Sequence, residues 1–210
     1  MGPDTVVAQL YLIRHGETLW SLTGQHTSRT DLPLTGHGEE QARQIGRLLH
    51  GIHFDRVLVS PLQRAGRTCQ LAGLGAIARV EPNLSEWDYG DYEGLTPAEI
   101  HAQRPGWDMF RDGCPGGESS DQMSTRVDRV LAELREMEGR AVLFSHGHFL
   151  RALAVRWINL SIRHGRELAL DPGSVSILMS EHNNSGGPAV SLWNGVSNEL
   201  FELVPRQPPS

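Results

Sequence analysis

Short apolar runs that end abruptly in polar residues constrain the fold of this chain more than any other feature. Three such runs occupy residues 6–13, 56–59 and 141–144. The first stops at Arg14-His15 and the third at Ser145-His146. Apolar runs of this length, rich in β-branched residues, are typical of buried strands. In α/β proteins the chemistry lies at the carboxyl ends of such strands, so we expect the site there.

Helical patterns separate the apolar runs. The expected helices span residues 36–50, 61–72, 97–103 and 120–137, with a further one ending near residue 158. Weaker strands are expected at residues 78–80, 174–179 and 189–193, the last two around a turn at 183–187. This alternation predicts an α/β three-layer sandwich, with a mostly parallel central sheet and helices on both faces. The length suits a single domain over residues 1–210, with a core at about 8–204 and short frayed termini.

The charged residues exclude several classes of function. All 19 cationic side chains are arginines, so a Walker-type phosphate loop, a kinase ATP site and a Schiff-base enzyme cannot be built. The formal net charge of −6 argues against nucleic-acid or anionic-membrane partners. No run approaches the roughly 18 apolar residues of a membrane span, and residues 1–9 lack a signal-peptide pattern. We therefore expect a cytoplasmic protein.

The cysteines and histidines form no pattern typical of a metal site. Cys69 and Cys114 are expected to be buried apolar side chains in a reducing compartment. His146 and His148 alternate along a predicted strand end and would point apart, and no His-Glu-x-x-His motif accompanies them. We therefore expect no metal and no cofactor.

Residues after separate strands are expected to meet in one crevice. A histidine after a strand is by itself more often structural, and an arginine in the first turns of a helix is usually a surface group. Arg14, His15, Arg64 and His146 all follow predicted strands, however, and the carboxyl ends of adjacent parallel strands converge. Together they predict a compact positive pocket in an acidic protein, which suits a small oxyanion.

The residue types in this pocket fit phosphoryl transfer. An arginine fork donates two parallel hydrogen bonds to a phosphate and keeps its charge. A neutral imidazole among cations can attack phosphorus and form a phosphohistidine, which water later cleaves. The leaving alkoxide needs a proton, and Glu86 in the long loop 81–96 is the candidate donor.

At these residues the chain resembles the histidine phosphatase superfamily, also called phosphoglycerate mutase-like. Within this superfamily it resembles the phosphatase branch that contains sedoheptulose-bisphosphatase and bacterial acid phosphatases. The resemblance covers about residues 8–200 and rests on the order and spacing of six motifs. These are residues 12–20 (LIRHGETLW), 31–35 (DLPLT), 60–65 (SPLQRA), 86–90 (EWDYG), 116–119 (GGES) and 145–148 (SHGH).

The resemblance implies a role for each matching residue. His15 resembles the phosphorylated nucleophile, and Arg14, Arg64 and His146 resemble the rest of the phosphate pocket. Glu86 resembles the proton donor that later acts as the base toward water.

A second set of residues matches positions that contact substrate: Ser21, Thr27, Ser28, Tyr89, Gly147 and His148. The serines and the threonine are as typical of turns as of contacts, and for His148 a structural role is equally compatible with the sequence. Arg67 and Arg151 are expected to support the site from outside or to pair at the surface. A second Arg-His-Gly at residues 163–165 lacks a preceding strand, so His164 is expected in a surface loop.

The sequence favours a metal-independent phosphatase for small phosphate esters, with sugar phosphates as the expected class. Mutases that resemble this pattern carry an insertion after the Glu-x-x-Tyr-Gly segment, and here residues 90–94 lead directly into a short helix. Phosphoglycerate mutase activity and noncatalytic phosphate binding stay open as alternatives. The sequence leaves the oligomeric state open, a homodimer included.

Overall fold

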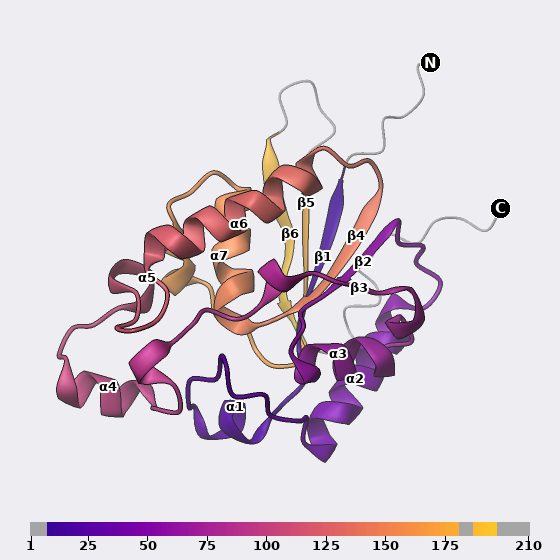
Figure 1. The fold of residues 1–210 in the computed structure, drawn as a ribbon. Helices are drawn as coiled ribbons and strands as arrows, with labels where there is room; N and C mark the ends of the chain where they lie inside the picture. The colour runs from indigo at the N-terminus through magenta and orange to yellow at the C-terminus, as the bar shows by residue number, and fades with distance from the viewer. Residues whose placement is uncertain (1–7, 181–186, 197–210) are drawn as a thin grey trace.

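One six-stranded sheet organises the molecule (Figure 1). The computed structural model describes residues 8–180 and 187–196. The strands are β1 (Gln9–Arg14), β2 (Arg56–Val59), β3 (Arg79–Val80), β4 (Arg140–Ser145), β5 (Val175–Ser180) and β6 (Pro188–Gly195), in the spatial order β3-β2-β4-β1-β5-β6. The pairs β3-β2, β2-β4 and β4-β1 are parallel, whereas β5 and β6 add antiparallel strands. The predicted mostly parallel sheet is therefore confirmed.

Helices cover both faces of this sheet. Helices α2 (Gly36–Leu49) and α3 (Gln63–Leu71) lie on one face, and α6 (Ser120–Arg135) and α7 (Gly147–Trp157) lie on the other (Figure 1). Strand β4 contributes apolar side chains to the core on each face of the sheet. Its Val142 and Phe144 belong to the core under α2 and α3, whereas Ala141 and Leu143 belong to the core under α6 and α7. Since successive side chains of a strand point to opposite faces, an apolar run is what a doubly covered strand needs.

Side-chain caps begin α2 and α6 at the residues where the sequence pattern predicts these helices to start. The Thr35 hydroxyl accepts from the backbone N–H of Gly38 at 3.0 Å and starts α2. Ser119 and Gln122 form a reciprocal capping box at the start of α6. The predicted start of α3 was wrong: this helix begins at Gln63 rather than at Pro61, because Leu62 keeps an extended backbone with ψ 136°.

The shorter elements are α1 (Leu19–Thr23), α4 (Pro97–Gln103), α5 (Met109–Asp112) and the 3₁₀ turns η1 (Gly75–Ile77), η2 (Pro82–Leu84), η3 (Gly90–Tyr92) and η4 (Ile162–Glu167). Helix α4 was predicted, whereas α1 and α5 were not. Most of the predicted turn at 183–187 and both predicted frayed termini lie outside the described residues. In the part of the chain that the structure describes, no helix is long and apolar enough to cross a membrane.

A backbone-to-backbone contact ties the end of β1 to the start of α2. A Cβ at Gly16 would lie 2.3 Å from the carbonyl oxygen of Gly38, and a Cβ at Gly38 would lie 2.2 Å from that of Glu17. Only glycine permits this approach. The contact fixes the chain directly after His15, at the edge of the sheet where the polar residues gather.

Candidate active site

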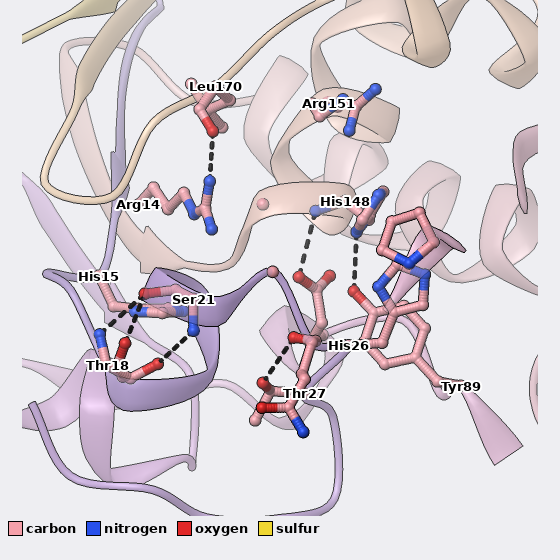
Figure 2. A pocket seen from close by; sticks show the side chains of 15 residues that line it. Arg14, His15, Thr18, Ser21, His26, Thr27, Tyr89, His148, Arg151 and Leu170 are labelled. Carbon is pink, nitrogen blue, oxygen red and sulfur yellow. Dashed lines mark hydrogen bonds between the residues drawn. The ribbon is translucent and has the colours of Figure 1, made fainter. Parts of the chain in front are cut away.

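The predicted catalytic residues gather around one cavity of about 240 Å³ (Figure 2). Arg14, His15 and Glu86 line it. Arg64 and His146 are fully buried and do not line it. The His146 ring instead lies behind His15, with the ring centroids 5.2 Å apart.

Strand pairing holds the first two residues in place. In the parallel ladder of β1 and β4, Arg14 lies opposite Ser145. The next residue, His15, donates its backbone N–H to the Ser145 carbonyl at 3.0 Å, and its own carbonyl accepts from Gly173 at 3.0 Å. The buried runs predicted from the sequence thus deliver Arg14 and His15 to the carboxyl edge of the sheet.

The His15 ring is held in the form that a nucleophile needs. Its Nδ1 lies 2.7 Å from the Gly16 carbonyl, which can only accept, so Nδ1 carries the proton and Nε2 keeps a lone pair. Burial, and then the charges of Arg64 and Arg14, hold the pKa of His15 well below its usual range. The ring therefore stays neutral in mildly acidic solution.

Arg14 presents an incompletely satisfied guanidinium to the cavity. One Nη donates to the Leu170 carbonyl (Figure 2), whereas Nε is buried without a hydrogen-bond partner among the described residues. A Cβ at Gly147 would lie 3.3 Å from the Arg14 Cζ, so the glycine leaves room for this side chain. An unpartnered buried donor beside the neutral ring of His15 is suited to an anionic ligand.

Arg64 and His146 are bonded to each other and to the protein. Arg64 Nε donates to His146 Nδ1 at 3.2 Å, and its Nη2 donates to the Thr27 carbonyl at 3.0 Å. His146 Nε2 therefore carries the ring proton, which it donates to Ser60 Oγ at 2.7 Å. The motif of residues 60–65 thus supplies both partners of this histidine.

Glu86 lies at the N-terminus of α7. Its carboxylate accepts from the backbone N–H groups of Trp87 at 2.9 Å, Phe149 at 2.9 Å and His148 at 3.1 Å. The last two belong to the first turn of α7, where unpaired N–H groups favour a negative charge. A carboxyl group is therefore fixed in the cavity wall that also holds Arg14 and His15.

Five of the six residues predicted to contact substrate line the cavity: Ser21, Thr27, Tyr89, Gly147 and His148. Ser21 is also part of the capping box of α1, where its hydroxyl bonds the backbone of Thr18 (Figure 2). Ser28 is buried outside the lining, and its hydroxyl donates to Glu93 and accepts from the backbone N–H of Tyr89. In this structure the Ser28 hydroxyl is used within the protein, and a substrate contact by Ser28 stays a prediction.

Two ionisable residues of the lining, His26 and Arg151, were not predicted as site residues. His26 stacks on Tyr89 with the ring centroids 4.6 Å apart, and burial lowers the pKa of His26 to about 4. Nothing in the sequence around His26 marks it. Arg151, expected outside the site, lines the cavity. Its spacing of three residues from His148 places both on one face of α7, which is the signal that could have found it.

The two cysteines are buried and His164 is exposed, as the sequence predicts. Cys69 and Cys114 are buried free thiols, and burial raises the pKa of each to about 12. His164, in the second Arg-His-Gly, is exposed in η4. Within residues 8–180 and 187–196, no group of three or more His, Cys, Asp or Glu side chains is placed to hold a metal ion.

Comparison with known proteins gives a match over nearly the whole described chain. Residues 10–195 match the model of the histidine phosphatase superfamily, branch 1. The chain is 44% identical over 178 residues to an acid phosphatase of Mycobacterium tuberculosis, covering 83% of this chain and 87% of that one. It is 30% identical over 248 aligned residues to sedoheptulose 1,7-bisphosphatase of Saccharomyces cerevisiae, covering 86% and 90%.

One further protein and one solved structure also match most of this chain. A protein of Salmonella choleraesuis described as a probable phosphoglycerate mutase is 33% identical over 178 residues, covering 80% of this chain and 83% of that one. The solved structure of an open reading frame product of Mycobacterium tuberculosis superposes with a TM-score of 0.83 at 38% identity, covering 90% and 98%. The shared fold, the matched motifs and the relatives described as phosphatases agree with the site built above. The chain belongs to branch 1 of the histidine phosphatase superfamily and is a phosphatase.

Proposed function

We propose that this phosphatase hydrolyses small phosphate monoesters, with sugar phosphates as the expected class, through a phosphohistidine on His15 and without a metal ion. The observation that carries the proposal is the state of the His15 ring. Its Nδ1 proton is donated to Gly16, its Nε2 lone pair has no hydrogen-bond partner among the described residues, and burial with two arginines keeps the ring neutral. A neutral imidazole with a free nitrogen is the form that can attack phosphorus.

In the first step His15 Nε2 attacks the phosphorus of the bound ester. The Nε2–P bond forms as the bond from phosphorus to the ester oxygen breaks, and Glu86 transfers its proton to the departing oxygen. Arg14 offers N–H donors to the phosphoryl oxygens, because its Nε has no partner in the part of the chain that the structure describes. Direct phosphate contacts from Arg64 and His146 are part of the proposal, although both bind protein groups in this structure.

In the second step water attacks the phosphohistidine. Glu86, now a carboxylate, accepts a proton from this water, and the Nε2–P bond breaks to release inorganic phosphate and neutral His15. The backbone donors around Glu86 support this step, since they hold the carboxylate facing the same cavity. The proton that Glu86 gives in the first step returns in the second, so the cycle is closed.

The size of the cavity supports a small substrate. Its volume of about 240 Å³ lies below the roughly 300–1,000 Å³ typical of pockets for drug-sized ligands. Two relatives add support for the class, because one is described as an acid phosphatase and another as a sugar bisphosphatase.

Trapping the intermediate tests the proposal. The enzyme is mixed with excess substrate, denatured in alkali, where phosphohistidine survives, and digested for mass spectrometry. We expect a phosphoryl group on the peptide that contains His15 and none on the peptide with the exposed His164. Loss of activity in EDTA would contradict the metal-free mechanism.

A substrate panel decides between the proposal and its alternatives. It contains aryl phosphates, sugar mono- and bisphosphates, and 3-phosphoglycerate with a bisphosphoglycerate primer. We expect release of inorganic phosphate to exceed any formation of 2-phosphoglycerate. The reverse ranking would make the protein a mutase, and no turnover of any ester would leave a phosphate-binding protein.

A further inference from the structure

A guanidinium on α6 holds the loop that carries Glu86. Arg126 donates from Nη1 to the carbonyl oxygens of Ser85 at 2.7 Å and Asn83 at 2.8 Å, and from Nη2 to the carbonyl oxygen of Glu86 itself at 3.2 Å. Arg126 is not among the residues that line the cavity. It is therefore placed to act on Glu86 rather than on a substrate.

The orientation of this guanidinium is set by an ion pair with Glu118. Arg126 Nε donates to Glu118 Oε1 at 2.9 Å, and Nη2 donates to Oε2 at 2.7 Å. The two side chains are 17% and 13% exposed, so the pair is largely withdrawn from water. An arginine has five N–H donors, and these two bonds with the three to carbonyl oxygens use all of them. Two parallel bonds to one carboxylate fix the plane from which the loop carbonyls are held.

Glu118 also holds the chain on the other side of Glu86. Its carbonyl oxygen accepts from the indole Nε1 of Trp87 at 2.8 Å, and its backbone N–H donates to the Asp88 carbonyl at 2.9 Å. The Trp87 side chain is fully buried. The ion pair therefore fixes the backbone both before and after Glu86.

Arg126 also contacts a residue that holds the Glu86 carboxylate. Its Cζ lies 5.0 Å from the centroid of the Phe149 ring, and the backbone N–H of Phe149 donates to Glu86 Oε1 at 2.9 Å. A proton donor must lie within hydrogen-bond reach of the departing oxygen. A displacement of about 1 Å at a reacting group costs about 100-fold in rate, so the support of this carboxyl group matters.

We propose that Arg126, oriented by Glu118, is a positioning residue for Glu86 and holds its carboxyl group where the leaving oxygen departs. This inference rests on the proposed function, because it requires Glu86 to be the proton donor. Arg126 binds no substrate atom and exchanges no proton in this role. Its loss therefore slows the steps in which Glu86 gives or takes a proton and leaves the attack by His15 on an activated ester largely intact.

The dependence on the leaving group tests this role. The kcat/KM of Arg126→Gln is measured for fructose 6-phosphate, whose alkoxide needs a proton, and for p-nitrophenyl phosphate, whose phenolate does not. This quantity covers the steps through departure of the leaving group and excludes the later attack of water. We expect the ratio of the two kcat/KM values, sugar phosphate over aryl phosphate, to fall about 10- to 100-fold relative to the wild type. Equal losses on both substrates would overturn the proposal.

A double-mutant cycle shows whether Arg126 acts through Glu86. In a Glu86→Gln background the proton donor is already lost, so adding Arg126→Gln should leave the ratio within about 2-fold of that of Glu86→Gln alone. A further fall in this background would overturn the proposal. The single variant Glu86→Gln separates the two levels of inference. If it leaves the ratio at the wild-type value, the proposed function has failed in its proton donor; if it lowers the ratio and Arg126→Gln does not, only the positioning role has failed.

A conservative variant and a matched control exclude a general loss of structure. Arg126→Lys keeps a cation beside Glu118 but brings three donors in place of five, so the ratio should fall less than in Arg126→Gln, by about 3- to 10-fold. Where urea unfolding shows that Arg126→Gln does not fold, Arg126→Lys decides alone, and an unchanged ratio would then overturn the proposal. Arg135→Gln is the control, because Arg135 lies on the same helix, donates to the carbonyls of Arg156 and Trp157 at 3.0 and 2.9 Å, and stacks on an aromatic ring. Its ratio should equal that of the wild type.

Discussion

Arg64 donates its Nε–H to Nδ1 of His146 across 3.2 Å, so a guanidinium fixes the tautomer of the imidazole that lies behind His15. The ring proton of His146 is consequently on Nε2 and is donated to Ser60. After burial itself, the charge of Arg64 is also the largest cause that lowers the pKa of His15 and of His146. Burial and this one side chain therefore both favour the neutral form of the two imidazoles.

Removing this charge should change the pH dependence of catalysis. In Arg64→Met the pKa of His15 is expected to rise, because the cation whose charge lowers that pKa most is gone. Since only neutral His15 can attack, activity is lost as the pH falls through this pKa, and the acidic limb of kcat/KM should move to higher pH. A pH profile and an NMR titration of the His15 ring measure the shift. Arg67→Met, which removes an exposed arginine of the same helix, is the control and should leave the limb in place.

His15→Ala should remove turnover. We expect kcat for p-nitrophenyl phosphate to fall about 10⁴-fold or more, because no other group can form the covalent intermediate. His164→Ala, in the second Arg-His-Gly, is the matched control and should behave like the wild type, since His164 is exposed in η4. Substantial residual activity in His15→Ala would rule out the assigned nucleophile.

Glu86→Gln should discriminate between leaving groups. A general acid contributes about 10²- to 10⁴-fold, and p-nitrophenolate leaves without help from an acid whereas a sugar alkoxide does not. The kcat for a sugar phosphate should therefore fall far more than the kcat for p-nitrophenyl phosphate. Equal losses on both substrates would argue against proton donation.

The same substitution carries a separate cost in stability. The glutamine NH₂ would meet backbone N–H groups that now donate to the Glu86 carboxylate. We expect the free energy of unfolding to fall by about 1–3 kcal/mol, as for unsatisfied buried donors. Urea denaturation measures this loss, and kinetics at a temperature where both proteins are folded keep the two effects apart.

His26 should make the protein less stable in acid. Its pKa is lowered to about 4 in the folded state from the ordinary value of 6.5, so the unfolded chain binds the proton more readily. The contribution is fully present above about pH 6.5 and is lost as the pH falls toward 4. Between pH 7 and pH 4.5 this amounts to about 2–3 kcal/mol.

A comparison with His26→Phe isolates this contribution. His15, His146 and His148 also have lowered pKa values and act in the same direction, so the wild-type slope alone does not identify His26. Urea unfolding at several pH values should give a shallower loss of stability in His26→Phe. Parallel curves for the two proteins would show that His26 is not the titrating group.

The strands and helices that carry a clear apolar or capping pattern could be predicted from the sequence around them. The apolar runs of β1 and β4 and the capped helix α6 carry their signals within a few residues, so they appear close to where they were expected. Helix α1 was missed because it has only five residues and buries none of them. Its one local signal is the reciprocal cap between Thr18 and Ser21.

The parts of the site that the sequence did not reveal depend on distant contacts. Arg14 is oriented by the carbonyl of Leu170, which lies 156 positions away in the chain. His26 gains its lowered pKa from burial against Tyr89 and Trp107, which no window around residue 26 contains. For Ser28 the sequence predicts a substrate contact. In the structure its hydroxyl donates instead to Glu93, a contact that the position of Ser28 in the loop does not reveal.

The parallel pairing of β1 and β4 places His15 and His146 at the same edge of the sheet. A slip of one residue between these strands would carry His15 past Ser145, turn Arg14 to the opposite face of the sheet and bring Gly16 to the edge. The core would lose its alternation at the same time, because Val142 and Leu143 serve different layers. The hydrophobic core therefore enforces the strand register that the site needs. A shift of β1 against β4 that displaced the site residues would also prevent the core from packing.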